Sequence, residues 1–420
     1  LQLQGGVILT AGGGTLALAT NAGQLNLDAA DGSLVTGVAT GAGARIELPA
    51  VVASGVGPDL TLGSDGTIDL QGTVNLGANN LSLQIDADAS GSDAIDIDQN
   101  IIAGVVSMAA GGIAGGDTIT VSVPLTSVSD DIRFSAVQTA DVNANLAAGG
   151  DIIATNVGDL QLVGGTSVSA TGNIDLDNTV TLVSVSGGGD VTLDQDGAGG
   201  VFLPVVNKAG PGGQTNVVIS AEGSVALSDV DLNAATDGDL TVNFDTDLAD
   251  GAETLSLSGP ITNVGDVSLS GTGTGDLIDV DASIDAEGAV SLSNADVRIV
   301  SGITITGTSP GTAVDLSTNV GTITLDGGPG SLSITAEGGG DINLADLVSA
   351  TGVSVNAVAQ GDITLADVTL TGGTNGNLTV AVDSDNNGTN VFNSTGTISD
   401  VGALSFSGNV INDDVINIGQ

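Results

Sequence analysis

One five-residue pattern recurs along the whole chain: Gly, a small polar residue, and then an apolar–polar–apolar triplet. Alternation of period two over so short a run is typical of a β-strand that buries one face. Because Gly tolerates positive φ, we expect it to let the chain bend sharply into each strand. The pattern stands at 14–18, 66–70, 72–76, 158–162, 172–176, 189–193, 223–227, 238–242, 265–269, 321–325, 340–344, 361–365 and 376–380.

The same alternation predicts which side chains form the core. In the copy at 340–344, Ile342 and Leu344 should point inward, while Asp341 and Asn343 should meet solvent or a turn. Aromatic residues make up only 1% of the chain, although a globular core normally depends on them for buried area. The interior must therefore consist of Val, Ile, Leu and Ala, in a thin core covered by many short, closely stacked strands.

A longer repeat lies over the short one. LQLQGG at 1–6 returns as LQLVGG at 160–165, and the clearest set of equivalent stretches has three members, at 66–88, 223–247 and 361–385. This repeat divides the chain into copies at 1–159 and 160–322 and a truncated third copy at 323–420.

The third copy lacks a stretch of about 25 residues that contains Leu-Pro in the other two copies, yet the pattern resumes after it. A β-sandwich that lost two strands would be left with an open core, whereas a solenoid that loses a coil becomes one coil shorter. We therefore predict an all-β fold, a parallel β-helix (β-solenoid) of roughly 17–21 coils in one continuous rod. Tandem β-sandwich repeats are the alternative.

Charge excludes two classes of partner. The chain has 50 acidic residues against four basic ones, Arg45, Arg133, Lys208 and Arg298, for a net charge of −46. Phosphate binding needs many Lys and Arg side chains, so neither nucleic acid nor an anionic membrane surface is an expected partner. The most apolar stretch, 101–116, is shorter than the ~20 residues of a membrane helix, and we expect no membrane insertion.

Catalytic chemistry is not expected either. Proton transfer and nucleophilic attack near neutral pH usually use His, Cys or Lys, but the chain has no His and no Cys, and Lys208 is its single Lys. Pairs of Asp could support glycoside hydrolysis, yet the aromatic platforms of a sugar-cleaving cleft are almost missing. The sequence predicts a non-enzyme with no catalytic residues and no required cofactor.

Calcium is the one ion for which the sequence offers ligands. Three equivalent loops read DADASGSD (86–93), DTDLADGAE (245–253) and DSDNNGTN (383–390), and the last contains D-x-D-x-N-G, the opening of an EF-hand-type calcium loop. No Glu follows at the twelfth position, and a solvated acidic turn is the alternative interpretation. The candidate ligands are Asp86, Asp88, Asp245, Asp247, Asp250, Asp383, Asp385 and Asn387.

With these coils over essentially all 420 residues, the chain resembles the repeat regions of filamentous-haemagglutinin-type exoproteins and autotransporter passengers. The resemblance implies a right-handed parallel β-helix that is secreted to the bacterial cell surface, where it acts as an adhesin or a stalk. The alternative is a self-assembling filament, sheath or matrix component. The partner would be another copy of the chain, or a ligand on a host or neighbouring cell. Because Leu1 begins in mid-pattern without a signal peptide, we expect a piece of a longer protein.

The calcium hypothesis predicts a cation-specific effect on stability. Equivalent positions of stacked coils lie about 4.8 Å apart, so stacked carboxylates repel one another and bound cations should relieve the repulsion. We expect millimolar Ca²⁺ to raise the melting temperature, followed by circular dichroism, more than Na⁺ does at equal ionic strength. Replacing Asp383 and Asp385 by Ala should remove part of that difference. Identical melting in both salts would leave only a screened acidic surface.

Overall fold

The computed structural model consists of parallel β-strands and contains no helix in the part of the chain that it describes. Among those residues, no helix is long and apolar enough to cross a membrane. The chain divides into two compact units, Leu1–Pro211 and Gly212–Gln420. The structure describes all residues except 4–5, 20–21, 29–33, 42, 54–57, 86–91, 112–115, 178–181, 210–212, 233–237, 248–251, 273–274, 319, 329, 373, 386–388, 409–414 and 419–420.

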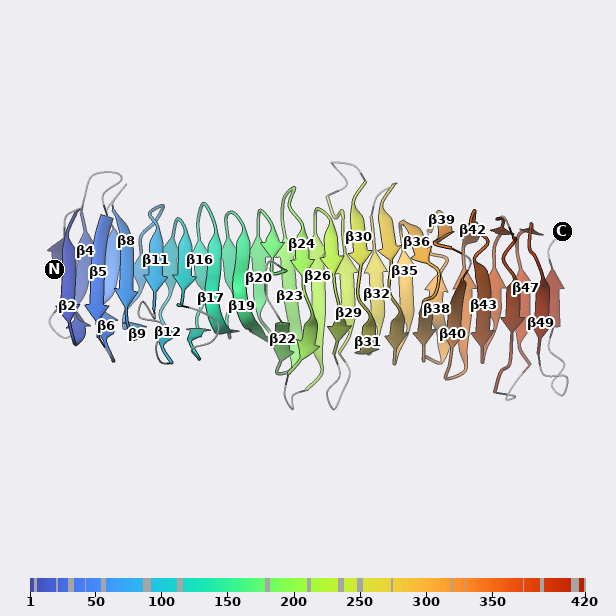
Figure 1. Cartoon of the computed structure of the whole chain (residues 1–420), viewed down its shortest axis with the longest axis horizontal. Helices are drawn as coiled ribbons and strands as arrows, with labels where there is room; N and C mark the ends of the chain where they lie inside the picture. Colours follow the sequence, from blue (N-terminus) through green and yellow to red (C-terminus); the bar gives the residue numbers. More distant parts are fainter. Residues whose placement is uncertain are drawn as a thin grey trace. The chain divides into compact units, whose positions relative to one another are not determined.

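Each unit is a stack of coils, and a coil contributes one short strand to each of three ladders (Figure 1). Every strand pairing found within a unit is parallel and joins equivalent strands of adjacent coils. A β-sandwich is built from antiparallel strands, so this pattern excludes the tandem-sandwich alternative. The fold-class prediction, an all-β parallel solenoid, is confirmed.

The ladders of the first unit are numbered by the order in which a coil visits them. The first ladder comprises β1 (Gln2–Leu3), β4 (Gln24–Leu27), β7 (Ala50–Ala53), β10 (Val74–Asn75), β13 (Ile101–Ala103), β16 (Leu125–Ser127), β18 (Leu146–Ala148), β20 (Ser167–Ala170) and β23 (Gly189–Gln195). The second comprises β2 (Ile8–Gly12), β5 (Leu34–Thr40), β8 (Asp59–Ser64), β11 (Leu81–Gln84), β14 (Val106–Ala109), β21 (Ile174–Asp175) and β24 (Val201–Leu203). The third comprises β3 (Thr15–Ala17), β6 (Arg45–Leu48), β9 (Thr67–Leu70), β12 (Ala94–Ile97), β15 (Thr118–Val121), β22 (Leu182–Ser186) and β25 (Val206–Lys208). Two long strands, β17 (Ile132–Val142) and β19 (Ile152–Val163), run through both the second and the third ladder.

The second unit repeats this order. Its first ladder comprises β26 (Thr215–Ala221), β29 (Leu240–Asn243), β32 (Val267–Ser270), β35 (Val290–Ser293), β38 (Gly311–Leu316), β41 (Gly340–Leu344), β44 (Ile363–Leu365), β47 (Val391–Ser394) and β50 (Val415–Ile418). The second comprises β27 (Val225–Leu227), β30 (Thr254–Leu257), β33 (Leu277–Val280), β36 (Asp296–Val300), β39 (Thr322–Asp326), β42 (Asp346–Ser349), β45 (Val368–Leu370) and β48 (Ile398–Ser399). The third comprises β28 (Val230–Asp231), β31 (Ile261–Val264), β34 (Ile284–Ala286), β37 (Thr304–Gly307), β40 (Ser331–Ala336), β43 (Ser354–Ala359), β46 (Leu378–Ala381) and β49 (Leu404–Ser407).

The number of coils is close to the prediction of 17–21. The stacked strands amount to a solenoid of about 15 turns, while the first ladder has nine described strands in each unit. The strand count is the more direct measure, because each first-ladder strand opens a new coil, and its total lies at the lower end of the predicted range. The right-handed sense of the helix stays a prediction.

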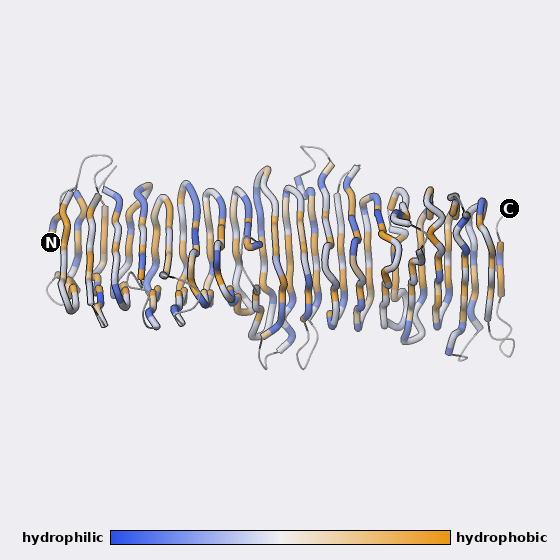
Figure 2. Tube along the Cα trace, in the orientation of Figure 1, coloured by the Kyte–Doolittle hydropathy of each residue, from blue (hydrophilic) through white to orange (hydrophobic). Residues whose placement is uncertain are grey.

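The core is the continuous interior between the three ladders. In β41, Ile342 and Leu344 are buried while Asp341 and Asn343 are only partly covered, so the predicted strand phase is confirmed. Figure 2 shows this alternation of apolar and polar residues along the strands of both units. Each buried Val, Leu or Ile contributes roughly 1.5–3 kcal/mol relative to an exposed one. The expectation of a core made only of Val, Ile, Leu and Ala is wrong at three positions, because Phe134, Phe244 and Phe392 are fully buried.

At the coil corners, a polar side chain hydrogen-bonds to the next coil. In the first ladder of the second unit, the Asp266 backbone N–H donates to Asp239 Oδ1 over 2.9 Å, and the Ala289 N–H donates to Asp266 Oδ1 over 2.7 Å. The Asp362 N–H likewise donates to Asp341 Oδ1 over 2.7 Å. Such corner caps satisfy backbone donors just before each strand, which explains the Asp, Asn, Ser or Thr that follows Gly in the short pattern.

These caps also explain the preceding glycines, and here our expectation about positive φ is wrong at most positions. Gly361 and Gly321 do not have a left-handed φ. A Cβ on Gly361 would instead overlap the Asp341 carboxylate, and a Cβ on Gly321 would overlap the Asp296 carboxylate, each capping from the preceding coil. Gly14, at the same motif position in the first coil, has no atom within 4 Å of such a Cβ.

The long sequence repeat does not contain a whole number of coils. GSVAL at 223–227 lies in the second ladder, on β27, whereas its counterpart GDITL at 361–365 lies in the first ladder, on β44. These two stretches are 17 strands apart (β27 to β44), which is five coils and two further strands. From the first copy to the second, β9 to β27, the chain passes 20 ladder positions, with β17 and β19 each counted twice. The interval from the second copy to the third is therefore three ladder positions shorter than the interval from the first copy to the second, and three ladder positions make up one coil.

The corner caps predict a coupling between glycine and the carboxylate below it. Gly321→Ala should lower the free energy of unfolding by about 1 kcal/mol, because the methyl group displaces the Asp296 carboxylate from the Thr322 N–H, 3.2 Å away. Asp296→Ala should cost a similar amount, and the double variant should cost no more than Asp296→Ala alone. Urea denaturation followed by circular dichroism measures all three.

Gly14→Ala is the matched control and should change stability by less than about 0.5 kcal/mol, because its Cβ meets nothing within 4 Å. Additive effects of the Gly321 and Asp296 substitutions would contradict the assigned role of the glycine.

Candidate functional site

The predicted calcium ligands are only partly covered by the structure. Asp86, Asp88, Asp250 and Asn387 lie outside the described residues. Asp245 and Asp383 have positive φ angles of 53° and 50° and are 1% and 2% exposed.

The two Asp residues of each described D-x-D turn lie in different environments. Asp245 and Asp383 are buried, whereas Asp247 and Asp385 are exposed. Among the residues that the structure describes, no group of three or more acidic side chains is arranged to hold a metal ion. The calcium site therefore stays a prediction, and its outcome depends on the loop residues beyond the described part.

Carboxylates stack on the third ladder of the first unit. Glu47, Asp69 and Asp96 occupy equivalent positions of three successive coils. Burial raises the pKa of Asp96, and the neighbouring charges of Asp69 and Asp98 raise it further. In this column like charges therefore face one another across neighbouring coils.

Two further pairs of neighbouring acids each contain a carboxyl with a raised pKa. Burial raises the pKa of Asp175, and the hydrogen bond and charge of Asp177 add to the effect. The hydrogen bond with Asp131 raises the pKa of Asp130 in the same way. In both pairs the charge of the neighbouring carboxylate contributes to the raised pKa.

The arginines lie against the carboxylates. Arg45 pairs with Glu47 over 3.0 Å and with Asp69. Arg298, on β36, contacts Asp279 and Asp281 of the preceding coil over 2.5 and 3.1 Å and Asp326 of the following coil over 3.4 Å. Arg133 pairs with Asp131. The three arginines thus act as internal counter-ions and do not form a basic binding surface.

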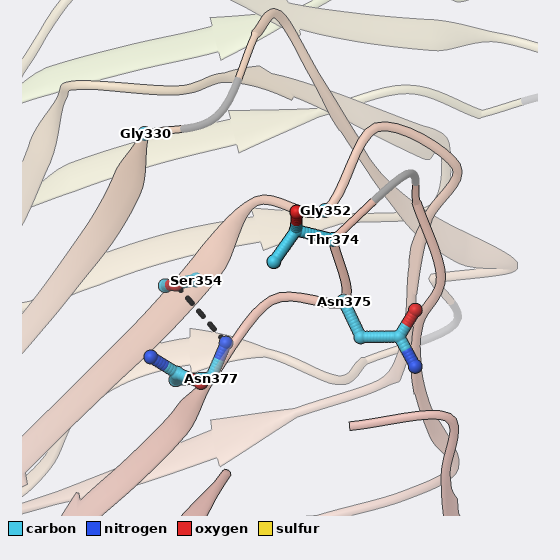
Figure 3. Close-up of a pocket in the computed structure, with 6 residues that line it drawn as sticks. All are labelled: Gly330, Gly352, Ser354, Thr374, Asn375 and Asn377. Atoms are coloured by element: carbon cyan, nitrogen blue, oxygen red, sulfur yellow. Dashed lines mark hydrogen bonds between the residues drawn. The ribbon is translucent and has the colours of Figure 1, made fainter. Parts of the chain in front are cut away.

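A pocket of a different character lies in the second unit, at the corner before the third ladder. Its volume is about 310 Å³, and it spans the beginnings of β40, β43 and β46 (Figure 3). Asn377 N–H donates to Ser354 Oγ over 3.0 Å across it. The lining residues are neutral and polar: Gly330, Gly352, Ser354, Thr374, Asn375 and Asn377.

Sequence reasoning did not single out these pocket residues. The available signal was the corner position after Gly, where GVS at 352–354 and GN at 376–377 carry Ser and Asn in place of Asp. Recognising the pocket also required knowing that three coils bring these stretches together.

Comparisons with known proteins add no relative: no family model, no curated protein and no solved structure matches the chain.

The Asp175–Asp177 pair predicts a pH-dependent stability. Because the folded pKa of Asp175 is raised, the folded chain binds this proton more tightly than the unfolded chain, and the stabilisation is lost as pH rises through the folded pKa. Asp175→Asn should therefore raise the melting temperature at pH 7, and the gain should shrink as pH falls toward the usual carboxylate range. Thermal melts over this pH range test it.

Asp285→Asn is the matched control, because Asp285 is exposed and stacks between Thr262 and Thr306 without a like charge in register. A gain for Asp175→Asn that stays constant across the pH range would show that the acid pair is not its cause.

Proposed function

We propose that this chain is a non-catalytic, secreted bacterial surface protein that acts as an adhesin or stalk, in the manner of filamentous-haemagglutinin-type exoproteins and autotransporter passengers. The observation that carries the proposal is the coil architecture, in which each coil pairs with its neighbours through three parallel ladders. Such a structure can be lengthened one coil at a time, which suits a molecule that holds a binding surface away from a cell.

Composition supports the non-catalytic part of the proposal. The whole sequence lacks His and Cys and has a single Lys, so the usual groups for nucleophilic and general base chemistry are missing. Several of the carboxylates that remain serve as corner caps, such as Asp239 and Asp266. A net charge of −46 also favours a soluble, extended molecule that does not bind nucleic acid.

The second candidate is a self-assembling filament or matrix component. It is favoured by the parallel ladders themselves, because coils that pair in the same way with both neighbours form a repeat to which further copies could add.

Cell binding and self-association distinguish the two functions. Beads coated with the chain should adhere to cell surfaces more than beads coated with an equally acidic protein, and sedimentation velocity should show one species over a wide concentration range. Concentration-dependent fibres without adhesion would favour the filament. Release of reducing ends from polysaccharides incubated with the chain would overturn the non-catalytic assignment.

A further inference from the structure

The pocket at the corner before the third ladder is a neutral site in a strongly acidic protein. In the coils that form it, the other two corners carry Asp caps: Asp341 and Asp362 before the first ladder, and Asp346 and Asp367 before the second. Before the third ladder the equivalent cap is Ser354, whose Oγ accepts the Asn377 N–H. None of the described residues that line the pocket carries a carboxylate.

The chemistry of the lining selects the class of ligand. Asn375 and Asn377 offer amide donors and acceptors, and Thr374 adds an exposed hydroxyl. Ser354 Oγ already accepts the Asn377 N–H, so its own hydroxyl proton is directed to another acceptor. Adjacent donors and acceptors without charge complement vicinal hydroxyl groups, whereas an anion would be repelled by the protein's field and a hard cation would find no carboxylate.

Size points to the same class. A volume of about 310 Å³ is at the lower end of the range of small-molecule pockets and suits one or two sugar rings. Gly352 is buried with φ +75°, and a Cβ there would overlap the Thr374 carbonyl. Gly352 thus allows two backbone segments that line the pocket to approach each other closely.

We propose that this pocket binds a neutral sugar unit, such as one presented by a glycan on a cell surface. The inference rests on the proposed adhesin function and specifies its ligand class. Binding would rely on hydrogen bonds without an aromatic platform, so we expect weak, millimolar affinity for a single unit.

Saturation-transfer difference NMR of the whole chain with maltose, cellobiose and lactose tests this, because it detects weak binding in a protein without Trp or Tyr. Glucuronate and galacturonate serve as acidic counterparts. Neutral sugars should receive saturation, and the acidic ones should receive much less. The double variant Asn375→Asp with Asn377→Asp, which exchanges amide donors for carboxylates, should bind about tenfold more weakly.

The matched control is Asn393→Asp with Asn417→Asp, which adds the same charge on the first ladder of the same unit, and it should bind like the original chain. Circular dichroism verifies that both variants fold. No transfer to any neutral sugar, equal transfer to acidic sugars, or an unchanged signal in the pocket variant would each overturn the proposal. If beads still adhere to cells in that case, the adhesin function stands and only the sugar site fails.

Discussion

At each coil corner a backbone N–H needs an acceptor, and the preceding coil supplies it. The Asp239–Asp266–Ala289 series shows how the requirement passes from one coil to the next, with the carboxylate of one residue accepting from the backbone of its successor. The capping oxygen lies against the glycine of the next coil, where it would overlap a Cβ. The glycine of one coil is therefore required by the Asp of the preceding coil. In the strand that follows, the inward side chains stack on the inward side chains of the preceding coil.

This interaction also accounts for the acidity of the chain. Asp is a better corner acceptor than a neutral residue because a charge-assisted hydrogen bond is stronger, yet it places negative charges one strand spacing apart. The structure lowers the resulting repulsion by alternating Asp with Asn and Ser and by placing Arg298 against three carboxylates. Burial and neighbouring like charges raise the pKa of Asp96 and of Asp175. The pocket proposed for a neutral sugar lies beside one of these neutral caps, Ser354.

Much of the fold could be predicted from the sequence, because period-two alternation determines which side chains are buried, as Ile342 and Leu344 show. The reason for the glycines could not be predicted. A Cβ on Gly321 would overlap the Asp296 carboxylate, and these two residues belong to different coils. The sequence repeat also gives no sign that its equivalent stretches GSVAL and GDITL lie on different ladders. The pocket could not be predicted for the same reason. Its residues are far apart in the sequence, and only the coil length shows that they lie side by side.

The central claim is that the coil is the unit of construction, and a deletion tests it most directly. Removing residues 267–289 joins Asp266 to Val290, which takes the place of Val267 in the ladder, because these two valines are register partners. Removing only 267–278 would instead bring Asp279 to that inward position. Melting followed by circular dichroism should show a cooperative β-fold for the whole-coil deletion and loss of cooperative folding for the partial one. Unfolding of the whole-coil deletion to the same extent as the partial deletion would contradict the account.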